Sequence, residues 1–252
     1  MTRLAALLGL ALLCAARSAD AEPSATAVAS YRIEATWDGE RKALVGRETV
    51  TFVNRTSRDV PDVLLHLRLN GFRDTRSALR RGLPPPSGPG DRGGCELKRV
   101  ALSGGADLLR SVSYGPPEGG EADDRTLARV PLPVPVPPGG TLVLEADFES
   151  RLPRGRLGTG WTNDFVLAGQ WFPLLARATE VGWTAGPLRD LAPTPSDFGD
   201  YDVTLLLPAE VKGRVATTGR VVEEADAGSG QVRVRARARE VRDFAFAFSP
   251  RF

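Results

Sequence analysis

The stretch that decides the fold is residues 196–208, which read S-D-F-G-D-Y-D-V-T-L-L-L-P. Its front half is rich in turn formers, because aspartate side chains cap nearby backbone groups and glycine accepts a sharp corner. Its back half alternates apolar residues at positions 201, 203, 205 and 207 with Asp202 and Thr204. This alternation is typical of a half-buried strand, so we predict a strand entered from a tight corner, at the junction between two parts of a β-domain.

Segments with strand-like composition and alternation precede and follow this corner. We predict strands at residues 31–37, 44–53, 63–70, 95–102, 112–114, 127–136, 141–148, 214–223, 231–239 and 243–248. Glycine, proline, aspartate and asparagine separate them, and no segment has the apolar spacing of an amphipathic helix. The sequence therefore predicts an all-β fold, an antiparallel β-sandwich or saddle.

Composition allows a globular protein with a sizeable core. The chain has 252 residues, of which 42% are hydrophobic, and a formal net charge of +2. That charge is too small to indicate nucleic acid or another polyelectrolyte as a partner. Residues 79–94 depart from this composition, reading L-R-R-G-L-P-P-P-S-G-P-G-D-R-G-G. Because proline lacks a backbone donor and glycine weakens regular structure, we predict a flexible loop there.

The N-terminus resembles a secretory signal. Arg3 precedes an apolar run at residues 4–16, and A-D-A at residues 19–21 fits a cleavage site. The run is too short to cross a bilayer, and Leu13 disfavours a lipid anchor at Cys14 because small residues normally precede a lipidated cysteine. We therefore expect a signal peptide at 1–21, a tail at 22–29 and one β-domain at 30–252. The mature protein would be periplasmic, bound to the cell envelope or secreted.

Cleavage after Ala21 changes charge and cysteine content. It removes two arginines and one aspartate, which lowers the formal charge from +2 to +1. It also leaves Cys95 as the remaining cysteine, so no internal disulfide can form and the core must hold the domain together. We expect Cys95 to act as a small buried hydrophobe.

Several segments, taken in order, resemble the N-terminal β-domain of the M1 (gluzincin) zinc metallopeptidases, the aminopeptidase N-like proteins. They are Y-R-I-E-A-T-W-D at 31–38, G-R-E-T-V-T-F-V-N at 46–54, L-L-H-L-R-L-N-G-F-R at 64–73, L-P-V-P-V-P-P-G-G-T-L-V-L at 132–144, Q-W-F-P at 170–173, G-W at 182–183, D-F-G-D-Y-D-V-T-L-L-L-P at 197–208, V-A-T-T-G at 215–219 and R-D-F-A-F-A-F-S-P at 242–250. The resemblance covers residues 30–252. It implies an all-β domain that supports a catalytic domain.

The resemblance does not extend to catalysis. Members of the family hold zinc with H-E-x-x-H and a downstream glutamate, which requires two histidines, whereas this chain contains one. The G-x-M-E-N-type substrate loop is also missing, since the only methionine is Met1. We therefore expect no enzymatic activity and no cofactor in this chain. Zinc would belong to a catalytic domain outside it.

The resemblance also suggests two places for contact with substrate or partner. In the family this β-domain lends a polar residue near the site that receives the free amine of the substrate, and Gln170 is the candidate here. The C-terminal run places Phe244, Phe246 and Phe248 on one face of a strand. Because an exposed aromatic row favours aggregation, we expect a catalytic domain or another protein to cover it. A peptide is a further candidate partner of the domain.

Other candidate sites have ordinary structural explanations. His66 has no second histidine for a metal site, so we expect a partly exposed structural position. The aspartates at positions 190, 197, 200 and 202 could offer oxygens to calcium, but aspartate–glycine turns commonly occur without metal and the spacing is not that of an EF-hand. The segment G-R-L-G-T-G at 155–160 lacks the lysine and helix of a phosphate loop, which favours a turn.

Two further patterns concern binding. Arginines at positions 233, 235, 237 and 239 share one strand face, and a solvated face, or one that pairs with a partner's carboxylates, fits better than a nucleic-acid stripe in an exported, nearly neutral protein. Trp161, Trp171 and Trp183 support an alternative function, a free-standing envelope β-sandwich that binds a peptide or glycan on a tryptophan platform. Buried packing is the commoner use of tryptophan.

Overall fold

The computed structural model describes residues 27–77, 79, 85–86, 88–115, 123–155, 158–185 and 194–252. The predicted signal peptide at 1–21 lies outside these residues, as do most of the tail at 22–29 and much of the loop at 79–94. Part of that loop forms the 3₁₀ helix η2 (Pro89–Asp91). Within the described residues, no helix is long and apolar enough to cross a membrane.

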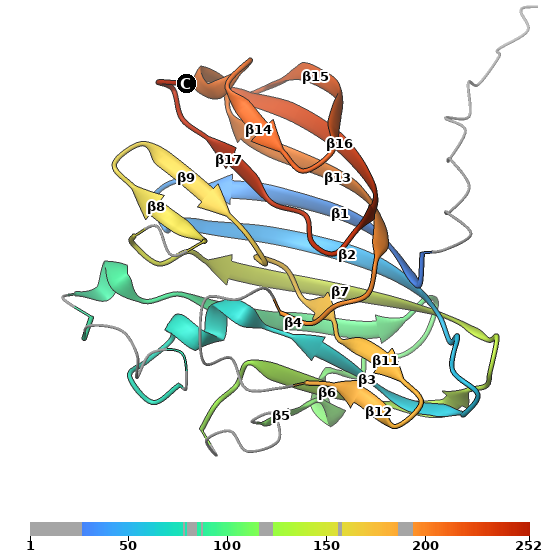
Figure 1. Cartoon of the computed structure of the whole chain (residues 1–252). Coiled ribbons are helices and arrows are strands. Elements are labelled where there is room, and N and C mark those ends of the chain that lie inside the picture. The colour runs from blue at the N-terminus through green and yellow to red at the C-terminus, as the bar shows by residue number, and fades with distance from the viewer. Residues whose placement is uncertain are drawn as a thin grey trace, which may run out of the picture.

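The largest sheet of the fold has seven strands (Figure 1). Its strands, in spatial order, are β15 (Arg220–Gly228), β16 (Gln231–Val241), β13 (Gly199–Pro208), β1 (Ala29–Asp38), β2 (Ala43–Val53), β7 (Thr141–Arg151) and β4 (Gly94–Leu102). Neighbours run antiparallel except β1 and β13, which pair in parallel with Tyr31 opposite Tyr201. The predicted strand after the corner at 196–208 is confirmed as β13, and it lies against the first strand of the domain.

Smaller sheets complete the all-β architecture. One contains, in spatial order, β10 (Leu174–Leu175), β3 (Val60–His66), β6 (Leu127–Val136) and β5 (Ser113–Gly115). Another contains β14 (Val215–Thr217), β17 (Phe246–Phe248), β9 (Phe165–Ala168) and β8 (Gly160–Thr162), and a hairpin joins β11 (Arg177–Thr179) to β12 (Gly182–Thr184). The 3₁₀ helices η1 (Arg68–Phe72), η3 (Leu109–Ser111) and η4 (Ala209–Val211) lie between strands.

The core lies between the inward face of the large sheet and the smaller sheets. Along β13 the alternating residues Tyr201, Val203, Leu205 and Leu207 are all buried. On the small-sheet side, Trp171 is fully buried and its ring contacts those of Phe148, Phe172 and Phe246. One apolar cluster connects these layers. The alternation that predicts each strand thus also selects its core face.

Three predicted strands are shorter or interrupted in the structure. The strand predicted at 63–70 ends at His66, after which the chain turns into η1. The strand predicted at 214–223 is interrupted at Gly219, which has φ +79° and whose absent Cβ would lie 2.2 Å from the carbonyl oxygen of Arg237. This corner separates β14 from β15. The strand predicted at 243–248 is shorter, because only β17 pairs with neighbours.

Candidate functional site

Gln170 lies in a buried polar cluster between β9 and β10. Its side chain is only 8% exposed, and its backbone has the left-handed φ of +48°. The backbone N–H of Gln170 donates a hydrogen bond of 3.1 Å to Oδ2 of Asp243, just before β17. A non-glycine residue in this conformation is strained and persists where surrounding contacts determine it. The carboxylate of Asp243 supplies such a contact.

The side chain of Gln170 is also held in place. The hydroxyl of Thr194 donates to Gln170 Oε1 at 2.7 Å, and Nη1 of Arg68 donates to the same hydroxyl oxygen at 3.3 Å. Arg68 and Thr194 are themselves 7% and 6% exposed. Four segments that are distant in sequence therefore meet at one polar cluster, in which the amide oxygen of Gln170 is already occupied.

Burial makes the carboxyl group of Asp243 harder to ionise. It raises the pKa of Asp243 to about 6, against the opposing effects of the N–H groups of Gln170 and Phe244 and of the charge of Arg68. The second oxygen of Asp243, Oδ1, is buried and has no hydrogen-bond partner within the described part of the chain. The carboxyl group of Asp243 therefore gains or loses its proton at a pH of about 6.

His66 lies in the same region and is more buried than the sequence predicts. It is 5% exposed, so the prediction of a partly exposed position is wrong, because the short strand β10 pairs with the end of β3 and covers it. Burial lowers the pKa of His66 to about 4, and the charge of Arg68 adds to this effect against hydrogen bonds with the backbone of Pro195 and Thr184. His66 is therefore neutral at physiological pH.

We expect His66 to make the domain less stable in acid. Its pKa falls from 6.5 in the unfolded chain to about 4 in the fold, so the unfolded state binds the extra proton as the pH drops through this window. The free energy of unfolding should fall by about 3 kcal/mol between pH 6.5 and pH 4 on this account. Asp243 acts in the opposite sense over part of the same range, so the parent must be compared with His66→Gln.

Urea unfolding of both proteins across this pH range isolates the contribution of His66. The difference in free energy of unfolding between the parent and His66→Gln should shift by about 3 kcal/mol between pH 7 and pH 4, in the direction that disfavours the parent. A difference that stays constant with pH would show that His66 keeps an ordinary pKa in the folded protein.

The alternative prediction of an exposed tryptophan platform is wrong for Trp171. Trp171 is 0% exposed, and its Nε1 donates to the carbonyl oxygen of Phe244 at 3.0 Å. Trp183 instead packs on Phe52 and donates to Asp62 at 2.8 Å, and Trp161 lies beneath basic side chains near β8. The three indoles lie in separate packing sites, because β8 and β12 belong to different sheets and Trp171 lies in the segment between β9 and β10.

The aromatic row of the C-terminal run is covered by the chain itself. Phe244, Phe246 and Phe248 are exposed by 0%, 1% and 3%, and their rings contact those of Tyr201, Trp171 and Trp37, respectively. The expectation that these side chains form a partner interface is therefore wrong. Seen from the sequence alone, the row lacks a cover, whereas the fold places it against the large sheet.

The aspartates considered for calcium are engaged separately. Asp197 pairs with Arg177 at 3.3 Å, Asp200 accepts the backbone N–H of Glu240 at 3.0 Å, and Asp202 binds arginines on β16. The aspartate at 190 lies outside the described residues. In the parts of the chain that the structure describes, no group of three or more His, Cys, Asp and Glu side chains is arranged to hold a metal ion. Within 155–160, Gly155, Gly158 and Thr159 lie at bends and Gly160 begins β8, and the N–H of Gly155 donates to the carbonyl oxygen of Trp161 at 2.9 Å.

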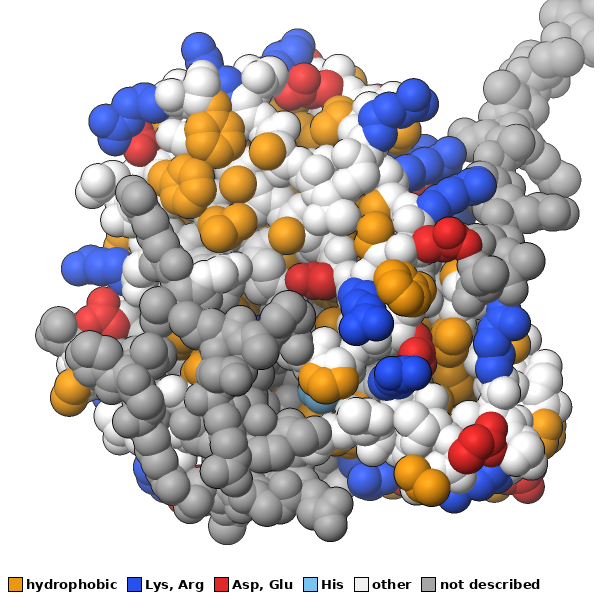
Figure 2. Space-filling model, viewed as in Figure 1, with side chains coloured by type: hydrophobic (Ala, Val, Ile, Leu, Met, Phe, Trp, Pro, Cys, Tyr) orange, Lys and Arg blue, Asp and Glu red, His pale blue; other side chains and the backbone are white. Residues whose placement is uncertain are grey.

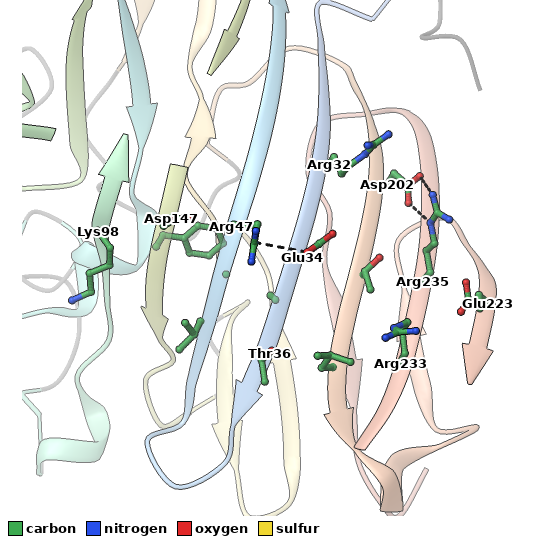
Figure 3. Close-up of a pocket in the computed structure, with 16 residues that line it drawn as sticks. Arg32, Glu34, Thr36, Arg47, Lys98, Asp147, Asp202, Glu223, Arg233 and Arg235 are labelled. Atoms are coloured by element: carbon green, nitrogen blue, oxygen red, sulfur yellow. Dashed lines mark hydrogen bonds and ion pairs between the residues drawn. The ribbon is translucent and has the colours of Figure 1, made fainter. Parts of the chain in front are cut away.

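A charged groove of about 1030 Å³ crosses the outward face of the large sheet (Figure 3). Its charged residues come from all seven strands of this sheet, and are Arg32, Glu34, Arg47, Lys98, Asp147, Asp202, Glu223, Arg233 and Arg235. Nε and Nη2 of Arg235 donate to the two oxygens of Asp202 at 2.7 and 2.6 Å, and Nε of Arg237 donates at 3.0 Å. Burial opposes ionisation of Asp202, yet these arginines lower its pKa.

These contacts engage two of the four arginines on the strand face at 233–239. Arg235 and Arg237 pair with a carboxylate on the neighbouring strand of this chain, so they need no partner to satisfy them. Arg47 and Glu34 lie 3.8 Å apart across β1 and β2. The groove is thus a face of mixed charge with pairs across strands, rather than a stripe of one sign.

A different face is apolar, the outward side of the small sheet β14-β17-β9-β8. Ala216, Ala247 and Leu167 pair side by side across this sheet and are partly or fully exposed. Beside them the rings of Phe165 and Phe252 lie 5.7 Å apart, and Phe252 is 55% exposed. Figure 2 shows hydrophobic side chains gathered over these strands. We call these five residues the apolar face.

Comparison with known proteins supports the fold through structure alone. No protein-family model matches the sequence, and no curated protein matches it. Among solved structures, the M1 zinc metallopeptidase from Deinococcus radiodurans matches over 88% of this chain and 42% of its own, with 17% identity and a TM-score of 0.50. Aminopeptidase A of Legionella pneumophila matches over 88% of this chain and 21% of its own, with 12% identity and a TM-score of 0.50.

The chain has the fold of the N-terminal β-domain of M1 zinc metallopeptidases. The fold and the resemblance predicted from ordered sequence segments are therefore confirmed. This M1-like domain spans less than half of the Deinococcus enzyme and about one fifth of the Legionella enzyme. The match concerns the part of these enzymes that is not catalytic.

Sequence reasoning missed most of the residues around Gln170. Arg68, Thr194 and Asp243 carry no local motif, because only the fold brings them together. Glu48 was also missed, although a signal existed. Val50 and Phe52 point inward from β2, so the period of two places Glu48 on the same buried face.

Proposed function

We propose that this M1-like domain is exported and acts as the non-catalytic N-terminal part of an M1-type zinc metallopeptidase, where it packs against and supports a catalytic domain. The likeness in fold carries the proposal, since it spans 88% of this chain but only 42% of the Deinococcus metallopeptidase. Zinc and the reacting groups would come from the catalytic domain. The signal-like sequence at 1–21 supports the proposed location outside the cytoplasm.

The apolar face is the surface that best fits such a catalytic domain. Exposed apolar surface of this kind favours association, because burial removes it from water. The outward face of the large sheet carries the charged groove, which includes the ion pairs Arg47–Glu34 and Arg235–Asp202. We therefore infer that the catalytic domain covers the sheet β14-β17-β9-β8 and leaves the outward face of the large sheet in solvent.

Gln170 is proposed to help position the substrate amine, as the resemblance implies. Its left-handed backbone supports a functional role, because strained residues are concentrated at binding and catalytic sites. Its amide oxygen accepts from Thr194, so contact with an amine would require this hydrogen bond to be shared or exchanged. Asp243 and Arg68 would then act as positioning residues.

The size of the native protein tests the proposal first. An antibody against this chain should detect a band much larger than the 27.0 kDa of the sequence in envelope or secreted fractions, or a band near that size that copurifies with a polypeptide containing H-E-x-x-H. The purified chain alone should bind no stoichiometric zinc and cleave no aminoacyl anilide. Turnover that survives repurification would contradict the non-catalytic assignment.

Matched substitutions test whether the catalytic domain packs on the apolar face. Leu167→Glu places a charge on the apolar face, whereas Thr204→Glu places one on the outward face of the large sheet. In the native assembly, Leu167→Glu should weaken association with the catalytic domain at least tenfold and lower aminopeptidase turnover, while Thr204→Glu should change neither. Equal association and equal turnover of the two variants would show that the catalytic domain does not pack on the apolar face.

A further inference from the structure

A second pocket, whose lining does not include Gln170, contains arginines from four separate segments. It has a volume of about 590 Å³, and its basic residues are Arg73, Arg92, Arg125 and Arg151. Arg73 follows η1, Arg92 follows η2, Arg125 precedes β6 and Arg151 ends β7. Since these residues are spread over 79 positions of the sequence, their convergence is a product of the fold.

Among the described residues that line this pocket, arginines outnumber carboxylates. Its carboxylates are Glu96, which pairs with Lys98 at 2.7 Å, and Glu149, which accepts from Arg41. The hydrogen bond from Arg41 lowers the pKa of Glu149. Both carboxylates thus have their direct ion-pair partner outside the arginine set, and the charge of Arg151 also lowers the pKa of Glu149.

Among the described residues, three of the four arginines have no carboxylate within ion-pair distance. Arg73 lies 3.4 Å from Asp74, whereas no ion pair within the described residues involves the guanidinium groups of Arg92, Arg125 or Arg151. Clustered like charges repel one another, and the repulsion is stronger in a concave site with apolar walls than on open surface. A bound anion would relieve it.

The floor of the pocket is rigid and its wall is partly apolar. Oδ1 of Asn70 accepts the N–H of Cys95 at 2.8 Å, and Nδ2 of Asn70 donates to the carbonyl oxygen of Arg125 at 2.9 Å. This asparagine therefore ties the start of β4 to the segment that carries Arg125. Tyr114 and two leucines, Leu97 and Leu109, complete the lining, and the guanidinium carbon of Arg125 lies 5.7 Å from the ring centroid of Tyr114.

We propose that this pocket binds a small, multiply charged oxyanion, with Arg92, Arg125 and Arg151 as the binding residues and Tyr114 beside the apolar part of the ligand. Guanidinium groups match carboxylate and phosphate oxygens, which they can engage with two parallel hydrogen bonds. The pocket is large enough for a compact ligand of this class. The chemistry is shared by polycarboxylates and phosphate esters.

Thermal unfolding of the purified chain tests the site with two probes, citrate and inorganic phosphate, at an ionic strength kept constant with sodium chloride. At least one probe should raise the melting temperature in a saturable manner, because a ligand that binds the folded state stabilises it. The probe that saturates at the lower concentration identifies the carboxylate or the phosphate as the preferred source of the oxyanion.

A double variant in the pocket and a control double variant elsewhere test whether the oxyanion binds at these arginines. The double substitution Arg125→Gln and Arg151→Gln should weaken the apparent affinity at least tenfold, which corresponds to about 1.4 kcal/mol. Both side chains are exposed, so the variant is expected to fold, and Arg92→Gln provides a second test. The control Arg220→Gln with Arg239→Gln removes the same charge from β15 and β16 and should bind as the parent does. A response no greater than that to sodium chloride, or equal losses in the control, would overturn the proposal.

Discussion

Replacing Trp171 with alanine is expected to lower the free energy of unfolding by about 3–5 kcal/mol, the range for truncation of a large buried aromatic side chain. The indole is fully buried and contacts three phenylalanine rings, which belong to β7, the segment before β10, and β17. Its removal leaves a cavity where the large sheet meets a small one. It also leaves the carbonyl oxygen of Phe244 without its donor.

This loss is a large share of the total stability of an ordinary domain, which is about 5–15 kcal/mol. Urea unfolding followed by far-ultraviolet circular dichroism measures it without relying on tryptophan emission. Trp171→Phe should lose less, because a smaller cavity remains. Val181→Ala is the control, since Val181 is 91% exposed and should leave the midpoint unchanged. A small effect of Trp171→Ala would mean that the two sheets do not depend on this contact.

Replacing Glu48 with methionine is expected to stabilise the domain at neutral and alkaline pH. Glu48 is 2% exposed, points into the core from β2, and neither of its carboxyl oxygens has a hydrogen-bond partner among the described residues. Burial raises the pKa of Glu48 well above its usual range. Removing an unsatisfied buried polar group is worth about 1–3 kcal/mol, and more when that group is charged.

The effect of Glu48 has a defined dependence on pH. Because its pKa is raised in the fold, the unfolded state loses the proton first, so the parent loses stability as the pH rises from the unfolded pKa, near 4.5, towards the folded pKa. Glu48→Met lacks this loss, and the gap between variant and parent should widen as the pH rises. Glu48→Gln should show the same flattening with a smaller gain.

Denaturant unfolding at several pH values distinguishes this effect from a simple change in packing. Glu34→Gln is the matched control, because Glu34 lies on the solvent face of β1 with a side chain that is 60% exposed, and it should follow the parent at every pH. A gap between Glu48→Met and the parent that does not vary with pH would show that the carboxyl group titrates normally in the folded protein.

The burial of Glu48 also affects its neighbours. Burial raises the pKa of Cys95 to about 12, and the charge of Glu48 adds to this effect. The expectation that Cys95 acts as a small buried hydrophobe is confirmed, since it is 5% exposed and its thiol stays protonated at physiological pH. An unreactive thiol fits a structural role in the floor of the arginine pocket.

Most of the local structure of this protein follows from its sequence. The alternation from Tyr201 to Leu207 places four side chains on one face of a strand, and the same period of two gives the inward and outward faces of β1, β2 and β16. This works because the period of a strand depends on the backbone alone. The count of one histidine likewise excludes a two-histidine zinc site without any structure.

Only the tertiary structure decided what each face meets. It covers Phe246 with Trp171, pairs Arg235 with Asp202, and gathers Arg68, Thr194 and Asp243 around Gln170. These contacts join residues separated by 24 to 126 positions. A strand's period fixes which side chains share a face, but the choice of neighbouring strand depends on the packing of the whole core, and local sequence patterns do not contain that information.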